Sequence, residues 1–304
     1  MELKECTYSN WPNCLELSNN LIKLVITLNV GPRVVFFGFK DSQNLFKNFE
    51  NQIGTNGRGK WLPYGGHRLW HAPEKASRTY CPDNSPVDYS WDGKTLTLNC
   101  PEEKPNQIRK VIEIEINEIT AEVNVNHKIY NTGNWAKELA AWCLTVMAAE
   151  GRAIIPQEPF VPHGINTDES LAPARPLVMW QFTKMDDPRF TWGNKFIQMR
   201  EGSAVNCKQK IGLLNKQGWA AYYLNGEAFV KKQEIQENAV YPDYGSSMEF
   251  YTEPGFLEIE SLSPLVTLNP GECVEHLECW QLFKCHLSKD EDEVEAKLLP
   301  LIKE

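Results

Sequence analysis

A chain of 304 residues with 42% hydrophobic content is long enough to remove roughly 75% of its unfolded surface from water, so a large core is available. The formal net charge of -9 argues against a polyanionic partner, because phosphate binding needs clustered lysine and arginine. We therefore expect no nucleic-acid partner.

The start of the chain, MELKECTYSNWPNC, has no apolar segment between basic residues and a cleavage site, so we expect no secretory signal. No apolar run approaches the ~20 residues needed to cross a bilayer. The nine cysteines are scattered, with no C-x-x-C pair, a pattern typical of reduced thiols. The sequence thus predicts a cytoplasmic protein with no membrane partner and no zinc site.

Apolar and polar residues alternate with a period of two in several short segments. In chain order these segments are residues 21–39, 94–100, 111–119, 121–131, 142–149, 218–225, 255–269 and 274–285. Asp92-Gly93 before the second of them is a hairpin signal, since glycine tolerates the positive φ of the turn. Short strands separated by Gly, Pro and Asn predict an antiparallel all-β architecture.

Two other segments interrupt this pattern. Residues 157–188, rich in proline and polar residues, predict a long irregular loop, which is either a binding element or lid or an ordered surface wrap. Residues 288–303 predict a short C-terminal helix, with Ser288 as N-cap and Glu291 three residues later. Since there is neither a repeat nor a composition break, we expect one domain over residues 1–304.

The stretch YGGHRLWHAPE, residues 64–74, carries the first candidate site. Gly65 and Gly66 permit a tight turn or a close approach of the backbone, and Pro73 prevents a helix from continuing. His67 and His71 are four residues apart, but the H-E-x-x-H pattern of a zinc helix is absent. We therefore predict no metal and no other cofactor.

Arginine and histidine beside an indole ring suit a pocket for a polyhydroxylated ring. An aromatic face such as that of Trp70 covers C–H bonds, Arg68 donates to hydroxyls, and a histidine moves protons near neutral pH. The alternative is structural: hydrogen-bonded histidines and an ion pair between Arg68 and Glu74 inside the loop. Trp61 and Trp70 also fit a core position.

The second candidate site is the segment FLEIESL, residues 256–262. On a strand, Glu258 and Glu260 lie on one face, so that face is rich in carboxylates; the alternative is an ordinary exposed polar face. Asp243, between Tyr241 and Tyr244, is a further candidate of the same kind. Oxygen ligands from several strands leave no spacing signature, so a calcium ion in this region stays an open alternative.

The remaining histidines divide into two groups. His163, in the loop PFVPHGIN, is placed where a substrate-facing residue would lie. His127 is in register with the apolar residues of its strand, and His276 and His286 lie in or near the last strand. We expect the latter three to be structural.

Taken together, the segment NVGPRVVFFGFKDSQNLF, the GGHRLW-x-APE motif and the later E-x-E-S-L-x-P-L-x-x-L-x-PGE motif resemble the galactose-mutarotase-like proteins, in particular an uncharacterised bacterial branch. The resemblance covers about residues 13–283. It implies a β supersandwich of two large antiparallel sheets with a sugar site on a concave face.

The resemblance also implies roles for residues, because aldose 1-epimerases of this fold use a histidine acid and a glutamate base. It suggests Glu260 as the base and His67, or alternatively His163, as the acid. Arg68 would orient sugar hydroxyls or a phosphate, with His71 and Glu74 as supports. The substrate-binding candidates are Arg68, Trp70, His71, Glu74, Asp243 and Glu258.

The sequence departs from the family in lacking N-H-x-x-H-G and the mid-chain histidine motif. The expected partner is a small-molecule sugar or sugar phosphate, and the expected reaction is interconversion of its anomers. The alternatives are a carbohydrate-binding protein without turnover and a protein related to glycan lyases or hydrolases.

Overall fold

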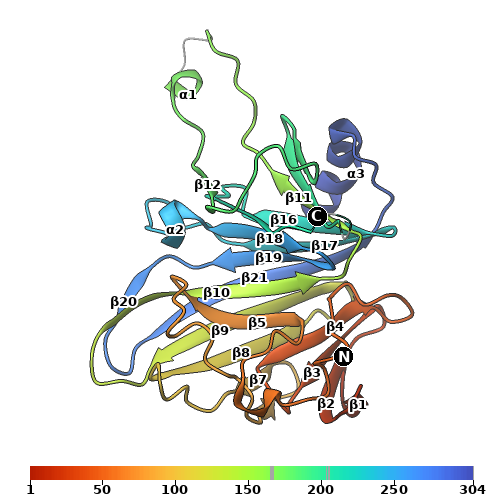
Figure 1. The fold of residues 1–304 in the computed structure, drawn as a ribbon. Helices are drawn as coiled ribbons and strands as arrows, with labels where there is room; N and C mark the ends of the chain where they lie inside the picture. Colours follow the sequence, from red (N-terminus) through yellow and green to blue (C-terminus); the bar gives the residue numbers. More distant parts are fainter. Residues whose placement is uncertain (165–167, 203, 205, 304) are drawn as a thin grey trace.

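The computed structural model describes residues 1–164, 168–202, 204 and 206–303. Two large antiparallel sheets pack face to face (Figure 1). The first sheet has the strand order β1-β2-β3-β4-β5-β10-β19-β18-β15-β12, and β20 also pairs with β10. Its strands are β1 (Glu2–Tyr8), β2 (Trp11–Ser18), β3 (Ile22–Thr27), β4 (Arg33–Phe39), β5 (Gly66–Ala72), β10 (Lys137–Met147), β12 (Leu177–Met179), β15 (Gln209–Leu213), β18 (Met248–Glu253), β19 (Phe256–Leu262) and β20 (Val266–Leu268).

The second sheet has the strand order β13-β14-β11-β16-β17-β21-β9-β8-β7-β6. Its strands are β6 (Asp88–Trp91), β7 (Leu96–Asn99), β8 (Ile108–Ile116), β9 (Glu122–Asn131), β11 (Arg152–Pro156), β13 (Phe190–Trp192), β14 (Phe196–Arg200), β16 (Trp219–Leu224), β17 (Glu227–Gln233) and β21 (Cys273–Lys284). Sheets of this size and arrangement confirm the predicted all-β supersandwich.

The alternating sequence pattern places the core between the two sheets. In β8 and β9 the apolar residues of the alternating pattern are buried and their polar neighbours face outward, as a period of two requires. Four aromatic rings occupy the middle of the interface, with neighbouring centroids 5.6 to 5.9 Å apart; they belong to Phe37, Phe46, Phe229 and Trp280. The core is therefore continuous across the sheets.

The helical segments are η1 (Gly57–Gly59), α1 (Asp168–Leu171), α2 (Pro242–Gly245) and α3 (Glu291–Lys303). The last packs through Val294, Leu298 and Ile302 against the second sheet, which confirms the predicted C-terminal helix. No helix among the described residues has both the length and the apolar character needed to cross a membrane.

The predicted cap of α3 is wrong by two residues. The backbone N–H of Glu293 donates to Asp290 Oδ1 at 3.0 Å, so Asp290 caps the helix in place of Ser288. Glu291 instead accepts backbone N–H groups of the loop at residues 194–196. The Glu291 carboxylate thus connects the start of α3 to the edge of the second sheet by hydrogen bonds.

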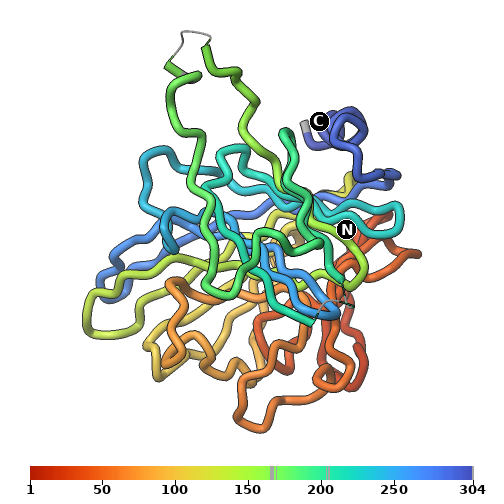
Figure 2. The backbone as a smooth tube through the Cα atoms, turned by 45° about the horizontal axis from the view of Figure 1, so that its top comes forward, coloured from red at the N-terminus to blue at the C-terminus, as the bar shows by residue number. Residues whose placement is uncertain are grey.

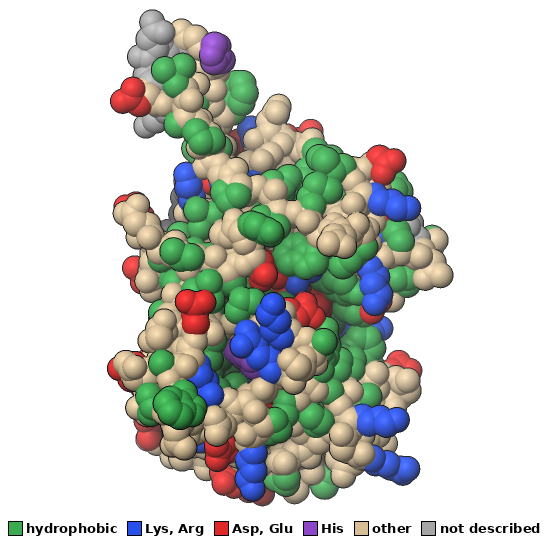
Figure 3. Space-filling model, turned by 60° about the vertical axis from the view of Figure 1, so that its left-hand side comes forward, with side chains coloured by type: hydrophobic (Ala, Val, Ile, Leu, Met, Phe, Trp, Pro, Cys, Tyr) green, Lys and Arg blue, Asp and Glu red, His purple; other side chains and the backbone are tan. Residues whose placement is uncertain are grey.

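Residues 157–164 and 168–176 project beyond the sheets between β11 and β12, and the second of these stretches carries α1 (Figures 1 and 2). Phe160 and Leu171 are strongly exposed there. On the face drawn in Figure 3, acidic and basic side chains are intermixed.

Candidate functional site

The motif at residues 64–74 forms β5, in the middle of the first sheet. There β5 pairs with β10, which pairs with β19. Since successive side chains of a strand point to opposite faces, Arg68 and Trp70 lie on one face of β5, and His67 and His71 on the other. All seven residues of β5 are buried, so both faces of the strand are covered.

Two glycines bring the chain into β5. Gly65 and Gly66 have φ values of +102° and +70°, a region that favours glycine. A Cβ at these positions would lie 2.0 Å from the carbonyl oxygen of Lys47 and 2.1 Å from that of Val34. The backbone at Val34 and Lys47 thus packs directly against the first residues of β5.

A cavity of about 500 Å³ lies over the face that carries Arg68 and Trp70. Its floor comes from β5, β10, β15, β18 and β19. Trp180 and Phe182, from the long loop at residues 157–188, form part of its wall. This segment, in which α1 and β12 interrupt the predicted irregular loop, therefore contributes to the lining of the cavity.

Two glutamates of β19 enter this cavity and pair with two cations. Arg68 Nη2 lies 3.1 Å from Glu258 Oε1, and Lys210 Nζ lies 3.0 Å from Glu260 Oε2. Lys210 Nζ also lies 2.7 Å from Glu249 Oε2, and the indole N–H of Trp142 donates to Glu260 Oε2 at 2.7 Å. The predicted carboxylate-rich face thus exists, and it is buried instead of exposed.

Aromatic side chains surround the charged groups. The rings of Trp61, Trp70 and Tyr80 lie 5.2 to 5.3 Å apart, and Trp142 lies 5.3 Å from Trp70. The Arg68 guanidinium stands over the Trp70 ring at 4.4 Å. Such contacts hold the arginine in place.

Burial governs the protonation of the cavity groups. It raises the pKa of Glu258 above 4.5, and the opposing attraction of Arg68 is too small to cancel this effect. Burial also raises the pKa of Glu249, against the effect of Lys210. For Lys210, burial lowers the pKa, but Glu249 and Glu260 outweigh it and the net pKa is raised. Lys210 is therefore positively charged in the cavity, and burial favours the protonated form of Glu258.

Several buried polar atoms at the cavity have no hydrogen-bond partner among the described residues. They are Arg68 Nε and Nη1, Trp61 Nε1 and Glu260 Oε1. Unpaired buried donors and acceptors cost about 1 to 3 kcal/mol each, so the polar groups around the cavity are incompletely satisfied.

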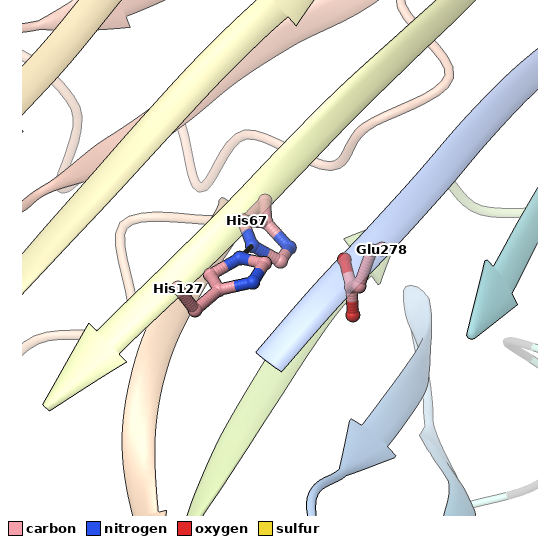
Figure 4. A group of neighbouring side chains, drawn as sticks. All are labelled: His67, His127 and Glu278. Carbon is pink, nitrogen blue, oxygen red and sulfur yellow. Dashed lines mark hydrogen bonds between the residues drawn. The ribbon is translucent and has the colours of Figure 1, made fainter. Parts of the chain in front are cut away.

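His67 does not enter the cavity. It lies between the sheets, fully buried, with Nε2 2.7 Å from His127 Nε2 (Figure 4). Its Nδ1 lies 2.9 Å from the Thr145 hydroxyl. Burial holds the pKa of His67 well below its usual value, so the ring is neutral. The structure therefore does not bring His67 to Glu260, because the strand period directs His67 and Arg68 to opposite faces.

The same interior cluster is the place where a metal ion would find ligands. His67, His127 and Glu278 have ligand atoms within 4.8 Å of one another, as do Cys143, His276 and Glu278. However, the Lys231 ammonium lies 2.8 Å from Glu278 Oε1 and also donates to the carbonyl oxygens of Cys143 and Ile259. A protein cation thus already neutralises the carboxylate, and the cluster does not fit a divalent ion.

The other sequence candidates lie apart from the charged floor. His163 is exposed on the projecting segment, and His71 is buried on the inner face, where burial lowers its pKa to about 3. Glu74 does line the cavity, but it accepts a hydrogen bond from Tyr80 instead of pairing with Arg68. Asp243 is half-buried in α2 and does not line the cavity.

No protein-family model matches the chain, and no curated protein sequence matches it at a significant level. Solved structures do match its fold. A TPR-domain containing protein from Parabacteroides distasonis has a TM-score of 0.60 and 14% identity over 90% of this chain, which spans 48% of that protein. A putative aldose 1-epimerase from Escherichia coli K12 has a TM-score of 0.56 and 12% identity over 88% of this chain and 98% of its own. The galactose 1-epimerase of Lactobacillus acidophilus NCFM has a TM-score of 0.56 and 13% identity over 94% and 99%.

The chain has the galactose mutarotase-like fold.

Within this galactose mutarotase-like fold, several cavity residues were not expected from the sequence. Lys210, Trp142 and Trp180 belong to this group, and so does Glu249 as the buried partner of Lys210, although it does not itself line the cavity. Lys208 and Lys210 alternate with glutamine and isoleucine at the start of β15, and this alternation is the only sequence signal for a cationic face there. Trp142 lies in β10, where residues on both faces are buried, so the sequence does not indicate which face of the sheet the Trp142 side chain lies on.

Proposed function

We propose that the cavity binds a reducing sugar and interconverts its anomers, with Glu258 as the acid and Glu260 as the base. The observation that carries this proposal is the sharing of one aromatic-lined cavity by two glutamates that have different partners. Neighbouring carboxyl groups in different environments are the usual way to obtain an acid and a base from the same residue type. The likeness to epimerases is a likeness of fold, so the site carries the argument.

The proposed reaction needs one proton donor and one proton acceptor. The Glu260 carboxylate takes the proton of the anomeric hydroxyl, and the protonated Glu258 gives its proton to the ring oxygen as the C1–O5 bond breaks. After rotation about C1–C2, the O5 hydroxyl adds to the other face of the carbonyl, and both protons return. General acid and base catalysis of ~10² to 10⁴-fold each is enough for such a reaction.

Glu258 replaces the histidine that the sequence suggested as the acid. The residues that line the described cavity include no histidine. The pKa of Glu258 is raised by burial, which increases the fraction of the carboxyl group that holds a proton near neutral pH. A buried glutamic acid is thus the proton donor best supported by position.

The charge balance favours a sugar without a phosphate. Arg68 pairs with Glu258, Lys208 lies 3.5 Å from Glu253, and Lys210 pairs with two glutamates. Each basic side chain lining the described cavity therefore has a carboxylate partner. A phosphate would have to compete with these carboxyl groups for Arg68 and the two lysines.

The test is the rate of anomer exchange, measured by NMR on freshly dissolved α-glucose and α-galactose. Wild-type protein should accelerate exchange, and Glu258→Gln and Glu260→Gln should each lower the rate at least 10²-fold while sugar affinity changes little. Glu275→Gln, which alters an exposed glutamate on the opposite sheet, is the matched control and should leave the rate unchanged. Equal rates in Glu258→Gln and wild type would contradict the proposed acid.

A sugar-binding protein without turnover is the second candidate. It is favoured by the ion pairs that already hold both glutamates, since a paired carboxylate is less free to exchange protons. Saturable sugar binding with unaltered anomer exchange would identify this function.

A further inference from the structure

His71 lies on the face of β5 opposite the cavity, and its side chain is not used by the proposed reaction. The residue is only 3% exposed. Its Nδ1 atom is buried and has no hydrogen-bond partner among the residues that the structure describes. Buried polar groups in folded proteins nearly always have a partner, and a bound ion is one explanation for an exception. The charges around His71 indicate which kind of ion suits it.

His71 lies at the end of the inter-sheet space where the chain passes from β9 to β10 (Figure 1). It is paired in register with Ala141 of β10, and the strand period places Lys137, four residues earlier, on the same face of β10 as Ala141. Lys110 lies between two core residues of β8, so it is also directed between the sheets. Figure 3, which brings this end of the molecule forward, shows basic side chains gathered beside a histidine.

The turn at residues 103–107 connects three basic residues at this end. Three residues of the turn contact them at distances of 2.7 to 3.4 Å; the pairs are Glu103 with Lys110, Gln107 with Lys137, and Asn106 with the carbonyl oxygen of Arg78. Burial, and then the positive charges of these three basic residues, lower the pKa of His71 to about 3, so its ring is neutral at pH 7. The three basic residues and His71 together form the basic cluster.

Two cations of the basic cluster have no carboxylate partner. Lys110 forms a buried ion pair with Glu103, whereas Arg78 and Lys137 form no ion pair with the residues that the structure describes. Arg78 Nη2 donates to the carbonyl oxygen of Pro73 at 3.0 Å, and Arg78 Nε is buried without a partner. Three cations and one carboxylate leave the cluster with an excess of two positive charges.

We propose that Arg78, Lys137 and His71 bind a phosphate group at this end of the inter-sheet space. A phosphate monoester carries a charge of about −1.5 to −2 at pH 7 and three strong acceptor oxygens, which match the two unpaired cations. Guanidinium and ammonium groups donate charge-assisted hydrogen bonds to phosphate, and the neutral ring of His71 can donate one N–H. Both Arg78 and Lys137 are half-buried, so they reach the surface from which such a group would enter.

The test is isothermal titration calorimetry of the full chain with inorganic phosphate at constant ionic strength. The wild-type protein should bind phosphate saturably, and Arg78→Gln, Lys137→Gln and His71→Phe should each weaken binding about three- to tenfold, the effect of one lost hydrogen bond. Lys94→Gln is the matched control, because the Lys94 side chain is 74% exposed and pairs with Glu115 near the other end of β8; its affinity should stay within twofold of wild type. Thermal unfolding of each variant checks that it folds.

Phenyl phosphate in the same titration distinguishes the two sources of a phosphate group. Binding tighter than that of inorganic phosphate would identify a phosphorylated small molecule as the ligand, and weaker binding would identify the free ion; both results support the site.

Two results would overturn the phosphate site. One is the lack of saturable binding at tens of millimolar phosphate, and the other is equal affinity in wild type, Arg78→Gln and Lys137→Gln. Neither result bears on the proposed function, because no residue of the basic cluster lines the cavity.

Discussion

Removal of the Lys210 ammonium is the most informative perturbation of the cavity, because one lysine holds two buried glutamates. Lys210 lies 2.7 Å from Glu249 and 3.0 Å from Glu260, and both carboxylates have 0% exposure. In Lys210→Met the aliphatic volume is largely kept but the charge is lost. Two carboxyl groups then remain in a dry site without their cation.

Breaking a buried ion pair by removing one partner costs about 3 to 5 kcal/mol, because the other charge is left uncompensated. An unfolding entropy of about 2.1 cal/mol/K per residue gives about 0.64 kcal/mol/K for this chain length. The expected decrease in Tm is therefore about 5 to 8 °C.

The loss of stability in Lys210→Met should also depend on pH. Lys210 lowers the pKa of Glu249 against the effect of burial, so without it that pKa rises further. A carboxyl whose folded pKa lies above its unfolded value opposes folding when it ionises. Lys210→Met should therefore be most destabilised at neutral and higher pH, with a smaller deficit in mildly acidic buffer.

Calorimetric unfolding of the variant at several pH values measures both effects. Lys208→Met is the matched control on the neighbouring stretch, since the Lys208 side chain is 61% exposed and lies 3.5 Å from Glu253; a surface pair of this kind contributes at most about 1 kcal/mol. If Lys210→Met were no less stable than Lys208→Met, the Lys210 ion pairs would not stabilise the cavity floor as argued.

Two further predictions concern the histidine cluster and the acid. His67→Ala should lower the free energy of unfolding by about 1 to 3 kcal/mol, because it removes the buried partner of His127 Nε2 and that of the Thr145 hydroxyl. Sugar affinity measured by calorimetry should not change, and a loss of affinity at unchanged stability would refute the structural role. The rate of anomer exchange should decrease with rising pH as Glu258 loses its proton, and the pKa that governs this decrease should lie above 4.5. Arg68→Met removes a group that lowers the pKa of Glu258, so it should move the decrease in exchange rate to higher pH in the pH–rate profile. An unchanged profile would contradict the assignment of Glu258 as the acid.

The strands could be predicted where one of their faces is polar. Residues 111–119 and 121–131 alternate because β8 and β9 have one inner and one outer face, so the period of two appears directly in the sequence. The same reasoning placed Glu258 and Glu260 on one face, and their shared cavity confirms it. The local sequence does not predict whether that face is exposed or buried, because the segment with Trp180 that covers it is distant in the sequence.

The direction of His67 could not be predicted for a related reason. Both faces of β5 are buried, so polar and aromatic residues occur on both, and no alternation marks the inner side. His67 satisfies its ring nitrogens with Thr145 of β10 and His127 of β9, and these partners depend on sheet packing. For the same reason Lys210 was missed, because its glutamate partners lie on strands far away in the sequence.

The position of a bound sugar in a crystal of the protein soaked with a reducing sugar tests the central claim most directly. The proposal predicts electron density for the sugar in the cavity over the first sheet, with sugar oxygens within hydrogen-bond distance of Arg68, Glu258 and Glu260. Density for the sugar on another surface, with the cavity unoccupied at saturating ligand, would contradict it.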